Sequence, residues 1–214
     1  MSITALKGIG FTVEVQKTLG SAKTISGITL ASPGVATSTS HGFSNGDVVV
    51  LSIAGMVQLN QVACRVSSVT TDTFTLEGID TTNFTAFTSG TATKVTAWDT
   101  IGWATSLNLA GSTPKEIDTT TLADTQLQVA YGMSAAGSGT IDGFDQVADT
   151  AMLNLRAAAT AQATRAFRMS YASGQRRIFN ANVSAGGGFS VSVNEAGKMS
   201  AAITVRGFIN EYSS

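Results

Sequence analysis

Apolar and polar residues alternate with a period of two along much of this chain. The clearest runs are Phe11–Val15, Phe167–Tyr171 and Ile203–Val205, and the same spacing recurs at 74–76, 129–133, 179–183 and 189–193. Successive side chains of a β-strand point to opposite faces, so this alternation predicts strands with one buried and one exposed face. Only two prolines, Pro33 and Pro114, occur in the chain, and they leave these strands uninterrupted. The sequence therefore predicts antiparallel, half-buried sheets.

One stretch, about 149–163, has a helical pattern instead. It contains no Gly or Pro, and Met152, Leu155 and Ala159 fall on one helical face. Asp145 or Asp149 can cap its start. We therefore expect a mainly β fold, an antiparallel β-sandwich or barrel with one flanking α-helix (about 149–163) and an inserted small all-β domain.

A shift in composition marks the predicted insert. Residues 24–95 are nearly all Thr, Ser, Val, Ala and Gly, with four acidic and two basic residues, whereas the rest of the chain has ten acidic and eleven basic residues. We interpret 24–95 as a small all-β domain on the outer surface of a core domain formed by 1–23 plus 96–214. Within the core, we expect Gly186–Gly188 to form a turn before a strand at Phe189.

The residues that usually carry chemistry are sparse. His41 and Cys64 are the only residues of their types, so a zinc cluster or an intrachain disulfide is not expected. Glu116 and Asp118 would share one face of a strand, but nothing in the nearby sequence suggests the pocket that a hydrolase pair requires. We therefore expect no enzyme, with no catalytic, cofactor-binding or metal-binding residues.

Net charge and hydropathy exclude some partners. The net charge is −1, which does not indicate attraction to nucleic acid or acidic lipid. The longest apolar stretch, near 48–56, is too short to span a membrane, and the N-terminal residues do not have a signal-peptide pattern. We expect synthesis and assembly in a cytoplasm, without a membrane partner.

Acidic and basic residues are separated along the core. Residues 116–149 contain six acidic residues and no basic one, whereas 150–177 contain five arginines and no acidic residue. One interpretation is a polar subunit whose acidic segment meets Arg176 and Arg177 of a neighbouring copy. The alternative is that these charges pair within one subunit or remain solvated, and the sequence leaves both open.

Several segments, taken in order, resemble the tail-tube (major tail) proteins of long-tailed bacteriophages, and the resemblance covers most of the core. They are 97–102 (AWDTIG), 115–124 (KEIDTTTLAD), 137–143 (GSGTIDG), 167–169 (FRM), 178–179 (IF) and 197–207 (GKMSAAITVRG). Segments 31–35, 41–49, 59–60, 72–76 and 84–90 resemble a separate module common in phage structural proteins, whose role is left open.

The resemblance implies a structural protein of the virion tail. Six copies would form a ring, and rings would stack into a hollow tube that delivers phage DNA without binding it sequence-specifically. It also implies tape-measure, tail-terminator and baseplate or tail-tip proteins as partners. Segment 117–122 resembles the family's long loop, which reaches a neighbouring subunit. We therefore expect a subunit interface at Glu116, Ile117, Asp118, Thr119, Thr120, Thr121 and Leu122, together with Arg176 and Arg177.

A function of another class remains open. A monomeric surface module that binds carbohydrate would also be a β-sandwich. Such modules need exposed aromatic platforms, for which Trp98 and Trp103 are the candidates, although both are equally suited to a core.

Overall fold

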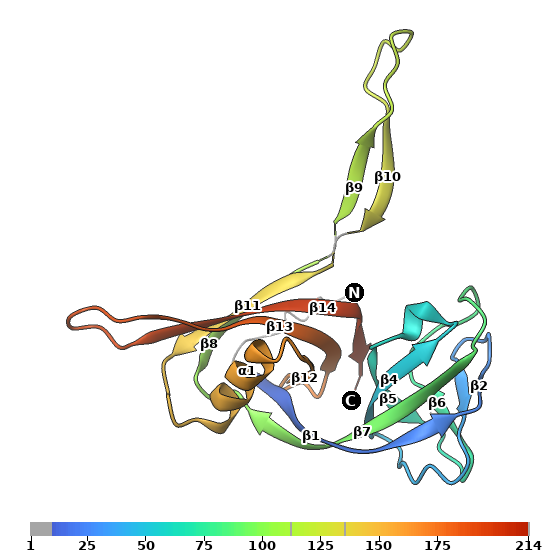
Figure 1. Ribbon diagram of the computed structural model, residues 1–214, viewed down its shortest axis with the longest axis horizontal. Coiled ribbons are helices and arrows are strands. Elements are labelled where there is room, and N and C mark those ends of the chain that lie inside the picture. The colour runs from blue at the N-terminus through green and yellow to red at the C-terminus, as the bar shows by residue number, and fades with distance from the viewer. Residues whose placement is uncertain (1–9, 112, 135, 214) are drawn as a thin grey trace.

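The structure is a computed structural model that describes residues 10–111, 113–134 and 136–213 (Figure 1). In this part of the chain, twelve strands form one antiparallel sheet in the order β2-β3-β6-β5-β4-β7-β1-β12-β13-β14-β11-β8, and β9 and β10 form a separate hairpin. The predicted fold class, mainly β with one α-helix, is confirmed. The strands are β1 (Thr12–Ile25), β2 (Gly27–Ile28), β3 (Val35–Thr37), β4 (Val48–Ala54), β5 (Ala63–Ser67), β6 (Thr73–Leu76), β7 (Ser89–Thr100), β8 (Ala104–Ala110), β9 (Pro114–Asp118), β10 (Val129–Ser134), β11 (Ser138–Phe144), β12 (Thr164–Ser170), β13 (Arg176–Ser190) and β14 (Lys198–Tyr212), with a 3-10 helix at Val57–Leu59 and α1 at Thr150–Thr160.

The sheet curls into two lobes. The core lobe contains β8, β11–β14, α1 and the first half of β1 (Figure 1). The insert lobe contains β2–β6 with the second half of β1 and the first half of β7. Each lobe has its own cluster of buried apolar side chains. The predicted domain boundaries at 23/24 and 95/96 fall inside β1 and β7, which run continuously between the lobes, and the division into two domains stays a prediction.

Helix α1 begins where the sequence predicts. The Asp149 carboxylate accepts a hydrogen bond from the Met152 backbone N–H at 3.0 Å, which satisfies one of the unpaired donors of the first turn. Met152, Leu155 and Ala158 are buried against the sheet, where they join Phe167 and Phe179 in the core. Burial of a side chain such as Leu155 contributes about 1.5–3 kcal/mol to folding.

Most of the predicted alternating runs are half-buried strands. Val13, Val15 and Val205 face the core lobe, and Phe74 and Leu76 face the core of the insert lobe. Three expectations are wrong. The run 129–133 is not half-buried, because Val129 and Tyr131 lie in β10 of the separate two-stranded hairpin and are exposed. Gly186–Gly188 lie within β13 and do not form a turn. The run 189–193 extends beyond the packed part of the sheet, so its apolar side chains are exposed.

A third apolar cluster joins the two lobes. Val48 and Ala63 of the insert lobe pack with Ile178 and Tyr212 of the core lobe. The Asn210 amide donates to the Ala63 carbonyl at 2.7 Å, and the Arg65 N–H donates to the Tyr212 hydroxyl at 2.9 Å. These contacts fix the insert lobe against the start of β13 and the end of β14.

Candidate self-association surfaces

Side chains with catalytic potential are engaged in packing. Burial, with a smaller effect of the nearby Glu77 charge, raises the pKa of the Cys64 thiol to about 12, so the thiol stays protonated. His41 is buried between Phe43 and Phe74, and its Nδ1 accepts from the Phe43 N–H at 3.0 Å. Among the described residues, no group of three or more His, Cys, Asp and Glu could hold a metal ion.

The two tryptophans do not form an exposed platform. Trp103 is buried, and the Arg168 guanidinium lies 4.6 Å from the centre of the Trp98 ring. In the described part of the chain, no helix is long and apolar enough to cross a bilayer.

The interface segment predicted at Glu116 to Leu122 forms one strand and part of the tip of a projecting hairpin. β9 pairs with β10 in the register Asp118↔Val129 and Glu116↔Tyr131, and the hairpin rises far from the main sheet (Figure 1). Ile117 is 47% exposed, Tyr131 68% and Leu122 fully exposed. An isolated two-stranded hairpin is only marginally stable in water, so this exposed apolar surface favours a contact with another protein.

Two aspartates organise the tip of this hairpin. Hydrogen bonds from the Thr120 hydroxyl and N–H hold the pKa of Asp118 below its usual value, and bonds from the Thr121 N–H and hydroxyl do the same for Asp124. Both carboxylates are therefore ionised at neutral pH. With Glu116 and Lys115 also exposed, the hairpin presents a net negative surface.

Arg176 and Arg177 lie at the opposite side of the sheet. They begin β13 and pair in register with Tyr212 and Glu211, at the end of β14 that runs away from the hairpin (Figure 1). Arg177 Nη2 lies 2.9 Å from Glu211 Oε1, and Arg176 is exposed. None of the ion pairs among the described residues connects these arginines to the hairpin.

The charge separation in the sequence is partly resolved within the subunit. Arg156 pairs with Asp145 at 3.2 Å, and Arg168 pairs with Glu14 at 2.6 Å. Together with the Arg177 pair, three of the five arginines have an intrasubunit partner. Among the described residues, Asp145 is the one member of the acidic segment that pairs with an arginine of the basic segment.

Sequence reasoning missed two open strand edges. Among the described residues, β8 pairs only with β11. β12 accompanies β13 as far as Asn182, and the Val183 N–H still donates to the Ala163 carbonyl at 3.5 Å, so 184–190 is the part of β13 that pairs only with β14. In this part of the chain, the four strands β13-β14-β11-β8 therefore form a patch with an unpaired edge on each side. Leu107 and Leu109, two residues apart, were a signal for β8, but no local pattern shows that its edge is open.

Close contacts within this patch depend on glycine. A Cβ at Gly139 would lie 2.5 Å from the Asn108 carbonyl oxygen, and one at Gly143 would overlap the Trp103 carbonyl. Glycine at these positions lets β11 approach β8 closely. The glycines of segment 137–143 therefore permit the close packing of β11 against β8 in the patch.

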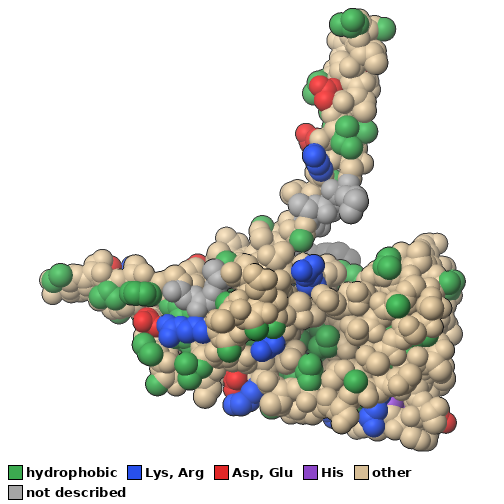
Figure 2. Space-filling view, viewed as in Figure 1, with side chains coloured by type: hydrophobic (Ala, Val, Ile, Leu, Met, Phe, Trp, Pro, Cys, Tyr) green, Lys and Arg blue, Asp and Glu red, His purple; other side chains and the backbone are tan. Residues whose placement is uncertain are grey.

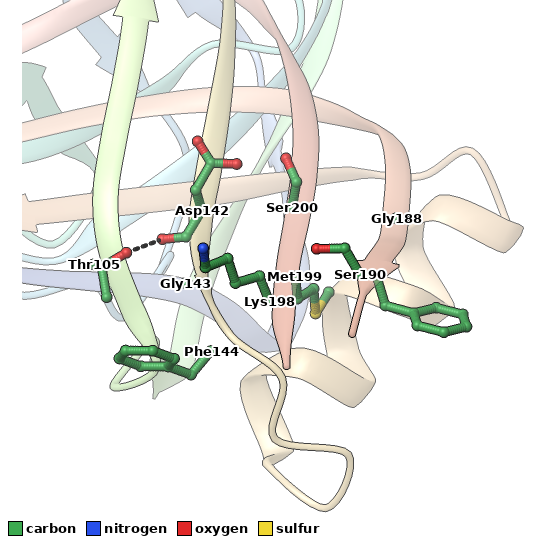
Figure 3. A pocket seen from close by; sticks show the side chains of 10 residues that line it. Thr105, Asp142, Gly143, Phe144, Gly188, Ser190, Lys198, Met199 and Ser200 are labelled. Atoms are coloured by element: carbon green, nitrogen blue, oxygen red, sulfur yellow. Dashed lines mark hydrogen bonds between the residues drawn. The ribbon is translucent and has the colours of Figure 1, made fainter. Parts of the chain in front are cut away.

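An open groove of about 500 Å³ lies where the patch meets the tip of the β13–β14 hairpin. Phe144, Phe189 and Met199 line it, and Thr105 Oγ1 donates to the Asp142 carbonyl at 3.1 Å on its wall (Figure 3). The ionisable residues of the lining are Asp142 and Lys198, which are not the paired carboxylates of a hydrolase. The groove suits an apolar contact better than a reaction.

Comparisons with known proteins identify a family. A family model described as "Phage tail tube protein, TTP" matches residues 54–214, so the match begins inside the predicted insert. The SPP1 tail tube, from solid-state NMR and cryo-EM, has 12% identity and a TM-score of 0.45, covering 56% of this chain and 70% of that chain. The virion of a native gene transfer agent particle has 15% identity and a TM-score of 0.43, covering 54% and 89%. No curated protein matches the chain.

Proposed function

The chain belongs to the phage tail tube protein family, and we propose that its copies close into six-membered rings that stack into a hollow tube for DNA delivery. Membership of the family makes it a structural protein of the virion tail that self-assembles into a tube.

The observation that carries the proposal is the pair of open edges on one four-stranded patch. Unpaired edges attract further strands, and natural proteins pair, cover or charge them. If β8 of one copy pairs with residues 184–190 of the next, each subunit uses two different edges in a head-to-tail contact. Such a contact generates a closed ring when the rotation per subunit divides a full turn.

The uncovered face of the patch would form the channel wall. α1 covers one face of this part of the sheet, and the other carries small polar side chains. A wall without a cluster of basic residues would let DNA slide, because phosphate binding depends on Lys and Arg. The residues of this face include Asn108, Ser138, Thr140, Ser184 and Thr204.

The acidic hairpin would connect one ring to the next. It projects from one side of the sheet, and Arg176 and Arg177 lie toward the other. In a second copy displaced along the direction of the hairpin, Arg176 and Arg177 would approach Glu116 and Asp118 of the first copy. Arginine can bind a carboxylate through two parallel hydrogen bonds, which gives such a contact a defined geometry.

The remaining parts of the proposal rest on the resemblance. The insert lobe would lie on the outside of the tube, because a lobe in the channel would obstruct DNA. Tape-measure, tail-terminator and tail-tip proteins would contact the tube, which would assemble in the host cytoplasm.

Mass measurement of the purified protein tests the ring. We expect a species of six times the 21.9 kDa chain, or polymers built from it, as the concentration rises. A chain that remains monomeric at high concentration would contradict the proposal and would favour the alternative of a monomeric binding module.

A further inference from the structure

We propose that the end of the core lobe formed by Phe144, Val147, Phe189, Val191 and Val193, here termed the apolar tip, binds a second copy of this chain beside the open edge of β13. This inference rests on the proposed ring and names a surface that the sequence does not predict. The contact within a ring would then be apolar, whereas the contact between rings would be charged.

The apolar tip is exposed to an unusual degree. Phe189 is 70% exposed, Val191 71% and Val193 90%. Hydrophobic side chains gather along the β13–β14 hairpin, which extends from the body of the protein at the left of Figure 2. Contiguous exposed apolar patches on soluble proteins usually mark interaction sites.

Two segments form the tip and are held together. The Asp145 N–H donates to the Gly197 carbonyl at 2.9 Å, which ties the start of the loop before α1 to the turn of the β13–β14 hairpin. Phe144 and Val147 flank Asp145 and are also exposed. The groove of about 500 Å³ lies between Phe144 and Phe189, so the tip offers both protruding side chains and a hollow to receive them.

Its position identifies a second copy as the occupant. The open edge 184–190 runs directly into the tip, so a neighbour whose β8 pairs along that edge would reach Phe189 and Val191. The charges nearest to the turn, Glu195 and Lys198, face each other at 3.5 Å and leave the tip without a charge to attract a polyanion. An apolar surface continuous with a strand edge suits the matching edge of another subunit.

The two proposed contacts should respond differently to salt. The Debye length falls to about 3 Å at 1 M salt, which screens exposed charges but does not weaken apolar burial. At high salt we therefore expect tubes to separate into rings, because the charged contact between rings weakens first.

The test is the double variant Val191→Ser, Val193→Ser, because both side chains lie beyond the paired strands and their loss should leave the monomer folded. The matched control is Leu30→Ser, Val57→Ser, at positions 52% and 65% exposed in the insert lobe. We expect the tip variant to raise the protein concentration needed for ring formation at least tenfold, and the control to leave it unchanged. Equal assembly of tip variant and wild type would overturn the inference.

Crosslinking identifies the occupant. A photoreactive amino acid at position 191 should crosslink to β8 (Ala104–Ala110) of a second copy in the assembled protein. Crosslinks confined to the insert lobe or to the β9–β10 hairpin would overturn the inference while leaving ring assembly intact. Failure of the wild-type protein to assemble at all would instead reject the proposed function on which the inference rests.

Discussion

Charge reversal at Arg176 and Arg177 separates assembly from folding. In the monomer, Arg177 forms a 2.9 Å pair with Glu211 in which both side chains are well exposed. Exposed pairs of this kind contribute about 0.2–1 kcal/mol, and the new carboxylate at position 177 would repel Glu211 on the neighbouring strand by a similar amount. Arg176→Glu, Arg177→Glu should therefore reduce the free energy of unfolding by about 1–2 kcal/mol. The midpoint of thermal unfolding of the monomer should therefore change by only a few degrees.

Assembly should respond much more strongly. If the two arginines meet Glu116 and Asp118 of the next ring, reversal places like charges together, which costs several kcal/mol at a close contact. A loss of only about 2.8 kcal/mol would weaken the contact between rings about a hundredfold. Light scattering against protein concentration at low salt measures this shift.

Two controls make the result specific. Lys23→Glu changes the charge as Arg176→Glu does but lies on the insert-lobe half of β1, so it should leave the assembly concentration unchanged. Adding Glu116→Lys and Asp118→Lys to the double reversal should restore stacking. Normal stacking by the arginine variant would refute the axial contact.

Three further predictions concern the monomer. Leu155→Ala, which removes a fully buried side chain from α1, should lower the free energy of unfolding by about 2–5 kcal/mol in denaturant titration, and a loss below 1 kcal/mol would contradict the packing described. Asp149→Ala should cost about 1 kcal/mol in the same assay through loss of the helix cap, whereas Asp149→Asn should retain most of it. The pKa of Cys64, raised to about 12 from an ordinary 9.0, should keep the thiol unreactive toward a thiol reagent at pH 8 until the protein unfolds. Because the unfolded state loses this proton first, stability should fall between about pH 9 and 12, and the Cys64→Ala variant should lose that part of the pH dependence.

Local signals predicted the elements well. The 149–163 segment has both an amphipathic face and a capping aspartate, and α1 begins at the residue after Asp149. Alternation likewise located Phe167 and Phe179 in buried strands, where their rings stack with centroids 5.4 Å apart. In these segments propensity, periodicity and turn chemistry agree with the tertiary structure.

Nonlocal features could not be predicted in the same way. The alternation of Phe189, Val191 and Val193 resembles that of a buried strand, but burial depends on whether another layer covers that part of the sheet. Gly186–Gly188 suggested a turn because glycine favours turns, yet β13 continues through them with shifts in register opposite β14. The hydrogen bond from Asn210 to Ala63 joins residues 147 positions apart and has no local signature.

The predicted interface segment and the open edges differ in the same way. The sequence identified Glu116 to Leu122 through resemblance, and the structure places them on an exposed hairpin. The open edges of β8 and β13 became visible only when all strand pairings were known. An edge is a property of the whole sheet, because it depends on which strand is absent beside it.

A cryo-EM reconstruction of the assembled protein tests the central claim most directly. We expect a ring in which β8 (Ala104–Ala110) of each subunit is hydrogen-bonded to residues 184–190 of its neighbour, so that the four-stranded patches join into one continuous barrel around a channel. An assembly in which both edges face solvent, or in which another element pairs with them, would contradict it.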